Sequence, residues 1–440
     1  MKQYPKYKDS GIHWIGFMPT DWNIQAMKHL FYMKGRIGWQ GLKADEFVND
    51  GPYLVTGTDF ENGKVVWDRC YHITKERYEE APEIHVKESD LLITKDGTIG
   101  KLAYIDVLPG ETSLNSHLLI IRPVSPNITN KFTYWLLQSD MFKRYTKLTQ
   151  SGSIMESLSQ EKIANFKFPL PPLAEQRAIV AYLDDKTSKM DECIRLLELQ
   201  KADLIDYRKA LISETVTRGL DPNAKLKDSG IEWIGQIPEG WEIRKCGHLF
   251  HTIGSGTTPQ SGNERYYSTY GHSWLQTGDL NDGFITETSK CVTDLALSEY
   301  SLPVYPVDSI VIAMYGATIG KLGILKIETC TNQACCVLAD GNGVHHKFAF
   351  YCLSAGKQEL INSANGGGQP NISQAIIRNF RIPLPPLSEQ QAIVEYLDTK
   401  TAKIDETICH IDEQIDDLRA YRTALICDVV TGKIDVRNAK

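Results

Sequence analysis

The stretch PLPPLAEQRAIVAYLD, Pro169 to Asp184, returns as PLPPLSEQQAIVEYLD at Pro383 to Asp398, with 13 of 16 positions identical. In each copy the prolines end an extended segment, because proline cannot donate a backbone hydrogen bond to a neighbouring strand. Glu-Gln then falls in the first turn of a long helix-forming stretch. Each copy therefore predicts a strand followed directly by a long helix.

Two further blocks repeat in the same order. KDSGIHWIGFMPTDWNI at Lys8 to Ile24 matches KDSGIEWIGQIPEGWEI at Lys227 to Ile243 at 11 of 17 positions. YRKALISETVT at Tyr207 to Thr217 reappears as YRTALICDVVT at Tyr421 to Thr431, with the same 214-residue offset as the proline block. The chain is therefore a duplication of one plan.

Between these blocks the two halves agree only in fragments, such as GTIGK at Gly97 to Lys101 against ATIGK at Ala317 to Lys321. The scaffold is repeated while the two inserted domains have diverged. The predicted boundaries are an N-terminal repeated segment (1–24), a first domain (25–168), a first spacer helix (169–219), a linker with the repeated segment (220–243), a second domain (244–382) and a second spacer helix (383–440).

The ends of the chain fit this plan. Asn-Ala-Lys at 223–225 links the first half to KDSG, and Asn-Ala-Lys at 438–440 ends the sequence. The termini thus interrupt an equivalent linker, so the sequence predicts a closed ring with a pseudo-twofold axis and neighbouring termini.

Both long helices carry an apolar stripe at alternating spacings of four and three residues, which is typical of a coiled coil. The stripe covers about 33 residues, or about 50 Å, comparable with about 15 base pairs of B-DNA. Ring closure makes the two helices antiparallel partners. Arg208 and Arg422 on the stripe are expected to extend their charged ends to solvent or to act as paired groups that set the orientation of the helices, rather than as catalytic groups. The positions are Leu183, Thr187, Met190, Ile194, Leu197, Lys201, Leu204, Arg208, Leu211 and Thr215 in the first helix, and Leu397, Thr401, Ile404, Ile408, Ile411, Ile415, Leu418, Arg422, Leu425 and Val429 in the second.

Composition limits the function classes. The 440 residues are 42% hydrophobic and 23% charged, with a net charge of -7, as in an ordinary globular protein. No apolar run approaches the roughly 18 residues of a membrane span, and the first residues lack a signal peptide, so a cytoplasmic protein without membrane contact is expected. The acidic balance means that any nucleic-acid binding must depend on local patches.

No reaction centre is visible in the sequence. Leu, rather than Asn or Asp, precedes both Pro-Pro pairs, so the tetrapeptide of an amino-methyltransferase is absent. GTIGK is not a phosphate-binding loop, because Leu102 follows Lys101 where Ser or Thr is required. The ten cysteines contain no CxxC pair and no HExxH motif occurs, so no metal site is predicted.

Polar, basic and aromatic residues in the two divergent domains are the candidates for DNA contact, since Arg and Gln read guanine and adenine edges and Lys mostly contacts phosphate. For each of them, an ordinary surface position is the alternative. The candidates are Arg36, Trp39, Gln40, Lys43, Lys143, Arg144, Lys147 and Ser153 in the first domain, and Thr258, Gln260, Asn263, Arg265, Tyr266, Gln369 and Asn371 in the second.

The twin PLPPLxEQxAIVxYLD blocks, KDSGIxWIG and the helical repeats resemble the specificity (S) subunits of type I restriction-modification systems over essentially the whole chain. The resemblance implies an α+β fold with two target-recognition domains of mixed α/β type, joined by two long antiparallel coiled-coil helices in a pseudo-twofold circular arrangement. It implies that each domain reads one half of an asymmetric, bipartite site in double-stranded DNA while the helices set the spacer.

The resemblance also implies partners. Two modification subunits that methylate adenine at N6 would dock on the helical regions, and restriction subunits would add ATP-driven cleavage. The chain itself would then be non-catalytic, with S-adenosylmethionine, ATP and Mg²⁺ on the partners. A DNA-targeting adapter for a different enzyme and a self-contained methyltransferase or nuclease remain as alternatives. The expected partner-facing anchors, for which a rigid domain-to-helix joint is the alternative role, are Pro171, Pro172, Glu175, Gln176, Pro385, Pro386, Glu389 and Gln390.

Overall fold

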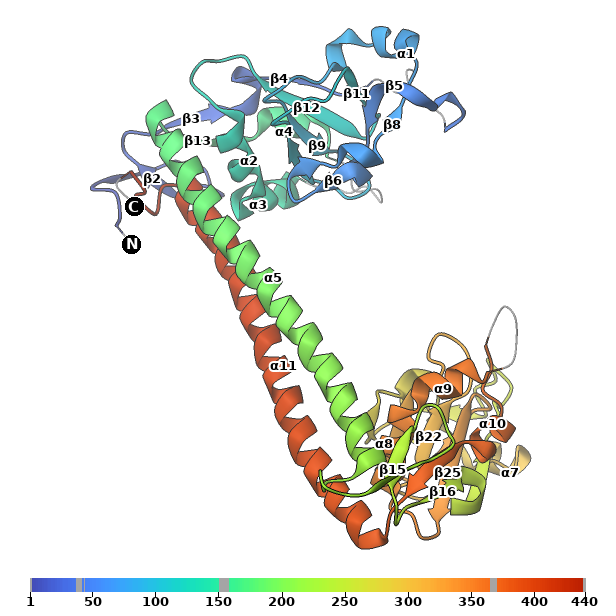
Figure 1. Ribbon diagram of the computed structural model, residues 1–440. Helices are drawn as coiled ribbons and strands as arrows, with labels where there is room; N and C mark the ends of the chain where they lie inside the picture. Colours follow the sequence, from blue (N-terminus) through green and yellow to red (C-terminus); the bar gives the residue numbers. More distant parts are fainter. Residues whose placement is uncertain (1, 37–41, 43, 150–157, 365–369, 438–440) are drawn as a thin grey trace. The chain divides into compact units, whose positions relative to one another are not determined.

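The computed structural model describes residues 2–36, 42, 44–149, 158–364 and 370–437. They divide into two compact units, one of residues 1–197 with 412–440 and the other of residues 198–411. Each unit contains one divergent segment, the start of one long helix and the end of the other (Figure 1). The repeat found in the sequence is therefore a repeat of folded units.

The first unit is built on a four-stranded antiparallel sheet with strand order β10-β9-β12-β4. Its strands are β1 Tyr7–Asp9, β2 Phe17–Pro19, β3 Asn23–Ala26, β4 Phe31–Lys34, β5 Val48–Val55, β6 Phe60–Glu61, β7 Lys64–Val65, β8 Tyr71–His72, β9 Leu91–Thr94, β10 Leu102–Tyr104, β11 Thr112–Leu114, β12 Leu118–Pro123 and β13 Lys167–Leu170. Its shorter helices are α1 Lys75–Glu79, α2 Asn130–Gln138, α3 Asp140–Thr149 and α4 Gln160–Asn165.

The second unit has a five-stranded sheet in the order β17-β25-β22-β23-β20. Its strands are β14 Leu226–Asp228, β15 Gln236–Pro238, β16 Glu242–Lys245, β17 Phe250–Ser255, β18 Tyr267–Ser268, β19 His272–Leu275, β20 Gly283–Ile285, β21 Cys291–Val292, β22 Ile310–Ala313, β23 Leu322–Leu325, β24 Cys330–Thr331, β25 Cys335–Gly341 and β26 Arg381–Leu384. Its shorter helices are α6 Cys246–Leu249, α7 Asp294–Glu299, α8 His346–Ala355, α9 Lys357–Asn362 and α10 Gln374–Asn379.

Both sheets are covered on two faces, which explains their continuous apolar strands. In β9 all four residues are buried; Leu91 and Ile93 pack in the cluster that contains Phe132 of α2, while Leu92 packs on the other face with Val55 of β5. The second unit repeats the pattern, with the apolar strand β22 between α8 on one face and β19 on the other. The two divergent domains therefore share one core design despite their different sequences.

The long helices are α5, Leu173–Arg218, with 46 residues, and α11, Leu387–Val430, with 44 residues. Each begins directly after the Pro-Pro pair that ends a short strand, as the sequence predicts. Glycines follow their C-termini, and Gly432, with φ of 76°, adopts the left-handed conformation that favours glycine. A Cβ atom there would lie 2.5 Å from Pro19 Cδ, so the helix end is closely packed on the N-terminal segment.

The predicted heptad stripe is confirmed. Every stripe position of α5 and α11 is buried or half-buried, while most positions between them are exposed. In the first unit Asp191 of α5 pairs with Arg422 of α11 at 3.0 Å, and in the second Arg208 pairs with Asp405 at 2.9 Å. The partner number falls as the α5 number rises, so the helices are antiparallel (Figure 1). Both arginines form ion pairs across the helix pair, which is consistent with the expected role of setting its orientation.

The two ends of the chain meet in the first unit. The Asp435 backbone N–H donates to the Lys2 carbonyl at 2.9 Å, and the Tyr7 hydroxyl donates to the Lys433 carbonyl at 3.3 Å. Val436 is buried in the core cluster that contains Tyr4 and Trp22. The neighbouring termini predicted from the interrupted linker are therefore present.

Candidate nucleic-acid interface

Three basic candidates of the first domain lie on one face of α3. Lys143, Arg144 and Lys147 are exposed, while Met141, Phe142 and Tyr145 on the opposite face are buried in the core. The amphipathic pattern thus attaches the helix to the domain by its apolar side and leaves three cations in solvent. This face has the charge and exposure that contact with phosphates requires.

Arg36 does not suit the predicted role. Its side chain is only 3% exposed, and the guanidinium donates to the Leu114 carbonyl at 2.8 Å and to Ser113 Oγ at 2.9 Å. A buried guanidinium that is bonded to the backbone of β11 supports the domain from inside and cannot reach a DNA backbone in this conformation. The assignment of Arg36 to DNA contact is therefore corrected to a structural role.

Five of the predicted DNA-contacting residues lie outside the described residues, and the structure gives no position for them. They are Trp39, Gln40, Lys43, Ser153 and Gln369.

In the second domain most candidates lie on the segment between β17 and β18. Gln260 and Arg265 are exposed there, and Thr258 and Asn263 are half-buried. Internal bonds hold the segment, because the Thr258 hydroxyl bonds to Gln333 and the Tyr300 hydroxyl accepts from the Gln260 backbone N–H at 3.0 Å. These side chains are presented by an ordered segment, and their role in DNA contact stays a prediction.

Tyr266 and Asn371 differ in what they can contact. Tyr266 is 9% exposed, and its hydroxyl donates to Glu299 at 2.6 Å. Its ring packs edge-on against Tyr300, so this residue stabilises the segment and its assignment to DNA contact is corrected. Asn371 is exposed and forms a β-bridge with Tyr315 in the turn after β22.

A groove of about 760 Å³ opens beside the segment between β17 and β18. Thr258 and Glu264 line it from that segment, and Trp274, Gln276 and Lys290 line it from β19 and the approach to β21. Of these five, only Thr258 was singled out from the sequence. Gln276 and Lys290 were missed because they occur in no repeat and in no basic or glycine-rich cluster, so the signal exists only after folding.

One glutamine in each unit attaches the divergent domain to its long helix. Gln176 of α5 is fully buried; its Nε2 donates to the carbonyls of Asn127 and Pro171 at 2.7 and 2.9 Å, and its Oε1 accepts from the Thr129 backbone N–H. Gln390 of α11 repeats the arrangement, donating to the carbonyls of Gly343 and Pro385 and accepting from the His345 backbone N–H at 2.7 Å. All bonding groups of both amides are used internally.

Glu175 and Glu389, one residue earlier, are also turned inward. Glu175 Oε2 accepts from Trp22 Nε1 at 3.1 Å, and Glu389 Oε2 accepts from Trp241 Nε1 at 3.0 Å. The tryptophans belong to the repeated N-terminal segments, so each glutamate binds such a segment to the start of a long helix. The assignment of Glu175, Gln176 and Gln390 as partner-facing anchors is corrected, because all three are buried.

The prolines of the joint are divided between interior and surface. Pro171 and Pro385 are buried, whereas Pro172 and Pro386 are exposed. The Pro172 carbonyl also accepts from the backbone N–H groups of Glu175 and Gln176, which fixes the first helical turn. Contact with a partner subunit at this joint therefore stays a prediction for the exposed Pro172 and Pro386 and the half-buried Glu389.

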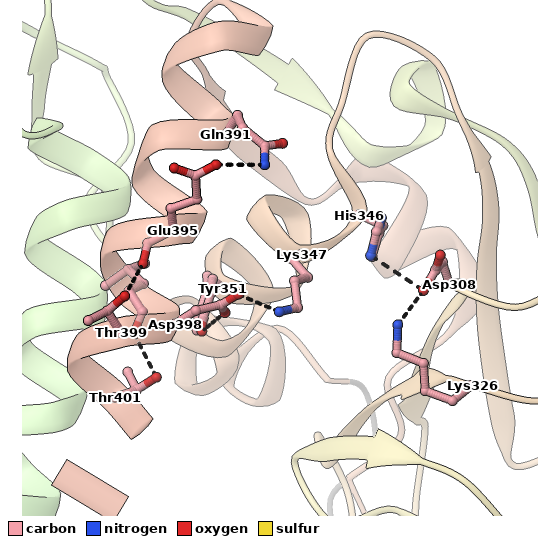
Figure 2. Close-up of polar contacts among 11 residues, drawn as sticks. Asp308, Lys326, His346, Lys347, Tyr351, Gln391, Glu395, Asp398, Thr399 and Thr401 are labelled. Carbon is pink, nitrogen blue, oxygen red and sulfur yellow. Dashed lines mark hydrogen bonds and ion pairs between the residues drawn. The ribbon is translucent and has the colours of Figure 1, made fainter. Parts of the chain in front are cut away.

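A carboxylate farther along each long helix adds a second attachment. Figure 2 shows Asp398 of α11 accepting from Lys347 at 2.5 Å and from Tyr351 at 2.8 Å, both on α8. In the first unit Asp184 of α5 accepts from Trp135 Nε1 of α2 at 2.9 Å. The equivalent carboxylate thus binds a different aromatic donor in each domain, and both contacts fix the domain on its helix.

Asp308 lies beside this attachment, between Lys326 at 2.8 Å and His346 at 3.5 Å (Figure 2). The hydrogen bond from Lys326 lowers the pKa of Asp308 from its usual value. Burial lowers the pKa of His346, so that its imidazole is neutral at physiological pH. Through Asp308 the cluster joins Lys326, which follows β23, to His346 at the start of α8.

Comparison with known proteins identifies the family to which these domains belong. The family model for the type I restriction modification DNA specificity domain matches residues 19–204 and again 238–416. Together these matches cover more than half of the chain. The chain belongs to this family.

Relatives of this specificity subunit span its whole length. It is 26% identical to the specificity subunit of the type I restriction enzyme MjaVIII of Methanocaldococcus jannaschii, over 96% of this chain and 95% of the relative. It is 24% identical to the MjaIX specificity subunit of the same organism, with the same coverage of both chains. The relatives therefore share the complete two-domain plan.

Solved structures agree on the fold. A chain from a study of complex assembly and conformational transition of the type I R-M system has a TM-score of 0.74 and 20% identity, covering 95% of the specificity subunit and 99% of that chain. The HsdS subunit from Thermoanaerobacter tengcongensis has a TM-score of 0.53 and 18% identity, covering 95% and 98%. The α+β fold with two domains and two long helices is thus that of known specificity subunits.

The thiols of the specificity subunit are mostly core groups. Burial raises the pKa of Cys246, Cys335 and Cys336 to about 12, which keeps these thiols protonated at neutral pH. Cys193 and Cys409 differ, since both are exposed on the long helices. Among the described residues, no cluster of three or more His, Cys, Asp and Glu side chains is placed to hold a metal ion, and no described helix could cross a membrane.

Proposed function

We propose that this specificity subunit directs a type I restriction-modification complex to an asymmetric, bipartite site in double-stranded DNA. Each recognition domain reads one half of the site. The paired helices set the spacer between the halves and dock two modification subunits, which are N6-adenine methyltransferases. The subunit itself is non-catalytic, and S-adenosylmethionine, ATP and Mg²⁺ are used by the modification and restriction subunits.

One observation carries the proposal: the joints of the two units are alike, while the surfaces that they carry differ. Gln176 and Gln390 make equivalent internal bonds in the two units. By contrast, the first domain presents the cations of α3, and the second presents the groove beside the segment between β17 and β18. Two domains that recognise different DNA sequences need the same attachment to the helices but different exposed surfaces, and this chain has both.

The long helices support the spacer role. α5 is continuous over 46 residues, about 69 Å at 1.5 Å per residue. Its heptad stripe is packed, and Asp184 and Asp398 attach each domain to its helix. A continuous, doubly attached helix resists bending, which a fixed spacer needs.

The test is a map of N6-methyladenine in genomes that express the modification subunit with this chain or without it. We expect a split, non-palindromic motif that depends on the chain. A version whose residues 25–165 are exchanged for those of another specificity subunit should change one half of the motif and keep the other half and the spacer. An unsplit or palindromic motif, or a change in both halves, contradicts the proposal. Methylation by the lone chain contradicts its non-catalytic role.

A further inference from the structure

The groove of the second domain contains groups of two kinds, those committed to holding its walls and those that face outward. Trp274 is 1% exposed and its Nε1 donates to the Thr257 carbonyl, while the Tyr267 hydroxyl donates to the Pro259 carbonyl at 2.7 Å. The aromatic residues therefore fasten the segment between β17 and β18 to β19. The amide N–H groups of the half-buried Gln276 and the ammonium of the exposed Lys290 are the polar groups left for a ligand, while the Gln276 side-chain oxygen caps the 3₁₀ turn that follows.

Backbone bonds fix Gln276 and Lys290 beside one another. The Lys290 carbonyl accepts from the Trp274 backbone N–H at 3.0 Å, which places Lys290 next to the strand that leads into Gln276. Asp279 then ties the two segments, since its Oδ2 accepts from the Gln276 backbone N–H at 2.8 Å and its Oδ1 accepts from the Ser289 backbone N–H at 3.1 Å. These hydrogen bonds fix the backbone at both positions before a ligand binds. Little backbone entropy is therefore lost on binding.

The first domain has the same turn with a different side chain. A short 3₁₀ helix follows β5 at Gly57–Asp59 and follows β19 at Thr277–Asp279. The Asp59 carboxylate accepts from the Thr56 backbone N–H at 2.7 Å, as Asp279 does from Gln276. In both domains the strand before the turn pairs in parallel with a later strand, β11 or β24.

Thr56 and Gln276 are therefore one structural position with two different side chains. A position whose backbone is fixed in both domains, while its side chain varies, suits the reading of two different sequences. The side-chain oxygen of Gln276 accepts from the Asp279 backbone N–H in the capping box of the turn, so its amide N–H groups remain to donate to base edges such as purine N7. The Thr56 hydroxyl instead donates to Asp59 Oδ2 at 3.0 Å and so belongs to its own turn. An ammonium such as that of Lys290 suits a phosphate.

We propose that Gln276 is a base-reading residue of the second half-site and that Lys290 binds the adjacent DNA phosphate. The inference rests on the proposed function and adds residues to it. Glu264 also lines the groove and repels phosphate, whereas Lys290 attracts it, so we expect the DNA backbone to lie nearer Lys290.

The experiment uses the full chain co-expressed with its modification subunit, methylation mapping, and binding to duplexes that carry the mapped motif. Gln276→Glu keeps the shape and removes the donor, and Gln276→Thr copies the first domain. Both should relax or change one position of the second half-site, with a roughly 10- to 100-fold loss of discrimination there. The first half and the spacer should stay as in the wild type, which also reports that the variant is folded.

Lys290→Ala should weaken binding to all sequences alike and lower the salt dependence of binding by about one phosphate contact. Lys290→Arg, which keeps the charge, is the matched control and should bind as the wild type does. The inference is overturned if both Gln276 variants keep the wild-type motif, or if they weaken all duplexes equally. An unchanged salt dependence in Lys290→Ala overturns the phosphate contact. A wild-type chain that yields no split motif instead refutes the proposed function itself.

Discussion

Glu175 and Glu389 are the same residue in the two repeats, yet their surroundings differ. Glu389 bonds to Trp241 where the chain runs on from α5 into the linker. Glu175 bonds to Trp22 and also to the Tyr4 hydroxyl, and Arg437 lies 3.8 Å away. Burial and the nearby carboxylate raise the pKa of Tyr4, so its hydroxyl stays protonated and donates. We call Lys2, Tyr4, Glu175, Asp435 and Arg437 the terminal clasp.

This difference predicts unequal effects of one substitution. Glu175→Gln removes the charge that faces Arg437 and leaves an amide donor among the donors of Tyr4 and Trp22. We expect it to destabilise the first unit by about 1–3 kcal/mol, and Glu389→Gln to destabilise the second unit by less. Scanning calorimetry of the full chain measures both. Equal losses for the two variants would contradict a special role of the clasp.

At this scale the sequence predicts a residue's type of partner better than its exposure. Arg36 has the chemistry of a DNA contact, but its acceptors on β11 lie 77 and 78 positions away in the chain, so nothing local announces its burial. Gln276 has no such chemistry in its neighbourhood, and its position becomes informative only when its turn is compared with that of Thr56. The burial of Arg36 and the position of Gln276 both depend on contacts that only the folded chain creates.

At the scale of elements, prediction from sequence works well for the long helices. Their heptad spacing and the Pro-Pro boundaries are local signals, and the duplication supplies the partner. The short strands of the divergent domains lack comparable periodic signals, so their boundaries cannot be predicted from the sequence. Their continuous apolar runs, such as Leu91–Thr94, are explained by cover on both faces, which is a tertiary property.

The ion pairs between the long helices lead to an element-scale prediction. Reversing Arg208 to Asp should place two acids opposite one another and lower the stability of the helix pair by about 1 kcal/mol. Adding Asp405→Arg should restore most of that loss, because the pair is re-formed with the opposite polarity. Unfolding by denaturant measures the double-mutant cycle.

Arg195→Ala is the control for this cycle. Arg195 pairs with Glu192 on the same helix, at 2.7 Å and with both side chains more than half exposed. Its loss should leave the stability of the chain almost unchanged, because solvent screens an exposed pair of this kind. If the Arg208–Asp405 cycle gives no larger coupling than this surface pair, the antiparallel register does not depend on it.

At the scale of the whole molecule, the chain closes on itself without a covalent bond. In the second unit, residues 219–226 link the end of α5 covalently to the next repeated segment. In the first unit, the hydrogen bond between Asp435 and Lys2 lies at the equivalent place. Asp221 accepts from the Asn223 backbone N–H in that linker, and Asp435 accepts from Arg437 in the same way. The break in the chain is therefore one of two equivalent places.

A circular permutant tests this equivalence. Joining residue 440 to residue 1 and starting the chain at Lys225, in an exposed turn, should preserve folding and DNA binding. Circular dichroism and methylation mapping with the modification subunit measure the outcome, with the unpermuted chain as reference. A permutant that folds but recognises no motif would show that the position of the ends matters to recognition.

The terminal clasp also determines where a tag or label attached to either end of the protein lies. Lys2 and Arg437 belong to the same joint, so an affinity tag or a fluorescent label at either end is delivered to the first unit and never to the second. Labels at both ends at once would sit within energy-transfer range of each other, and a fall in transfer would signal release of the last helix from the N-terminal segment.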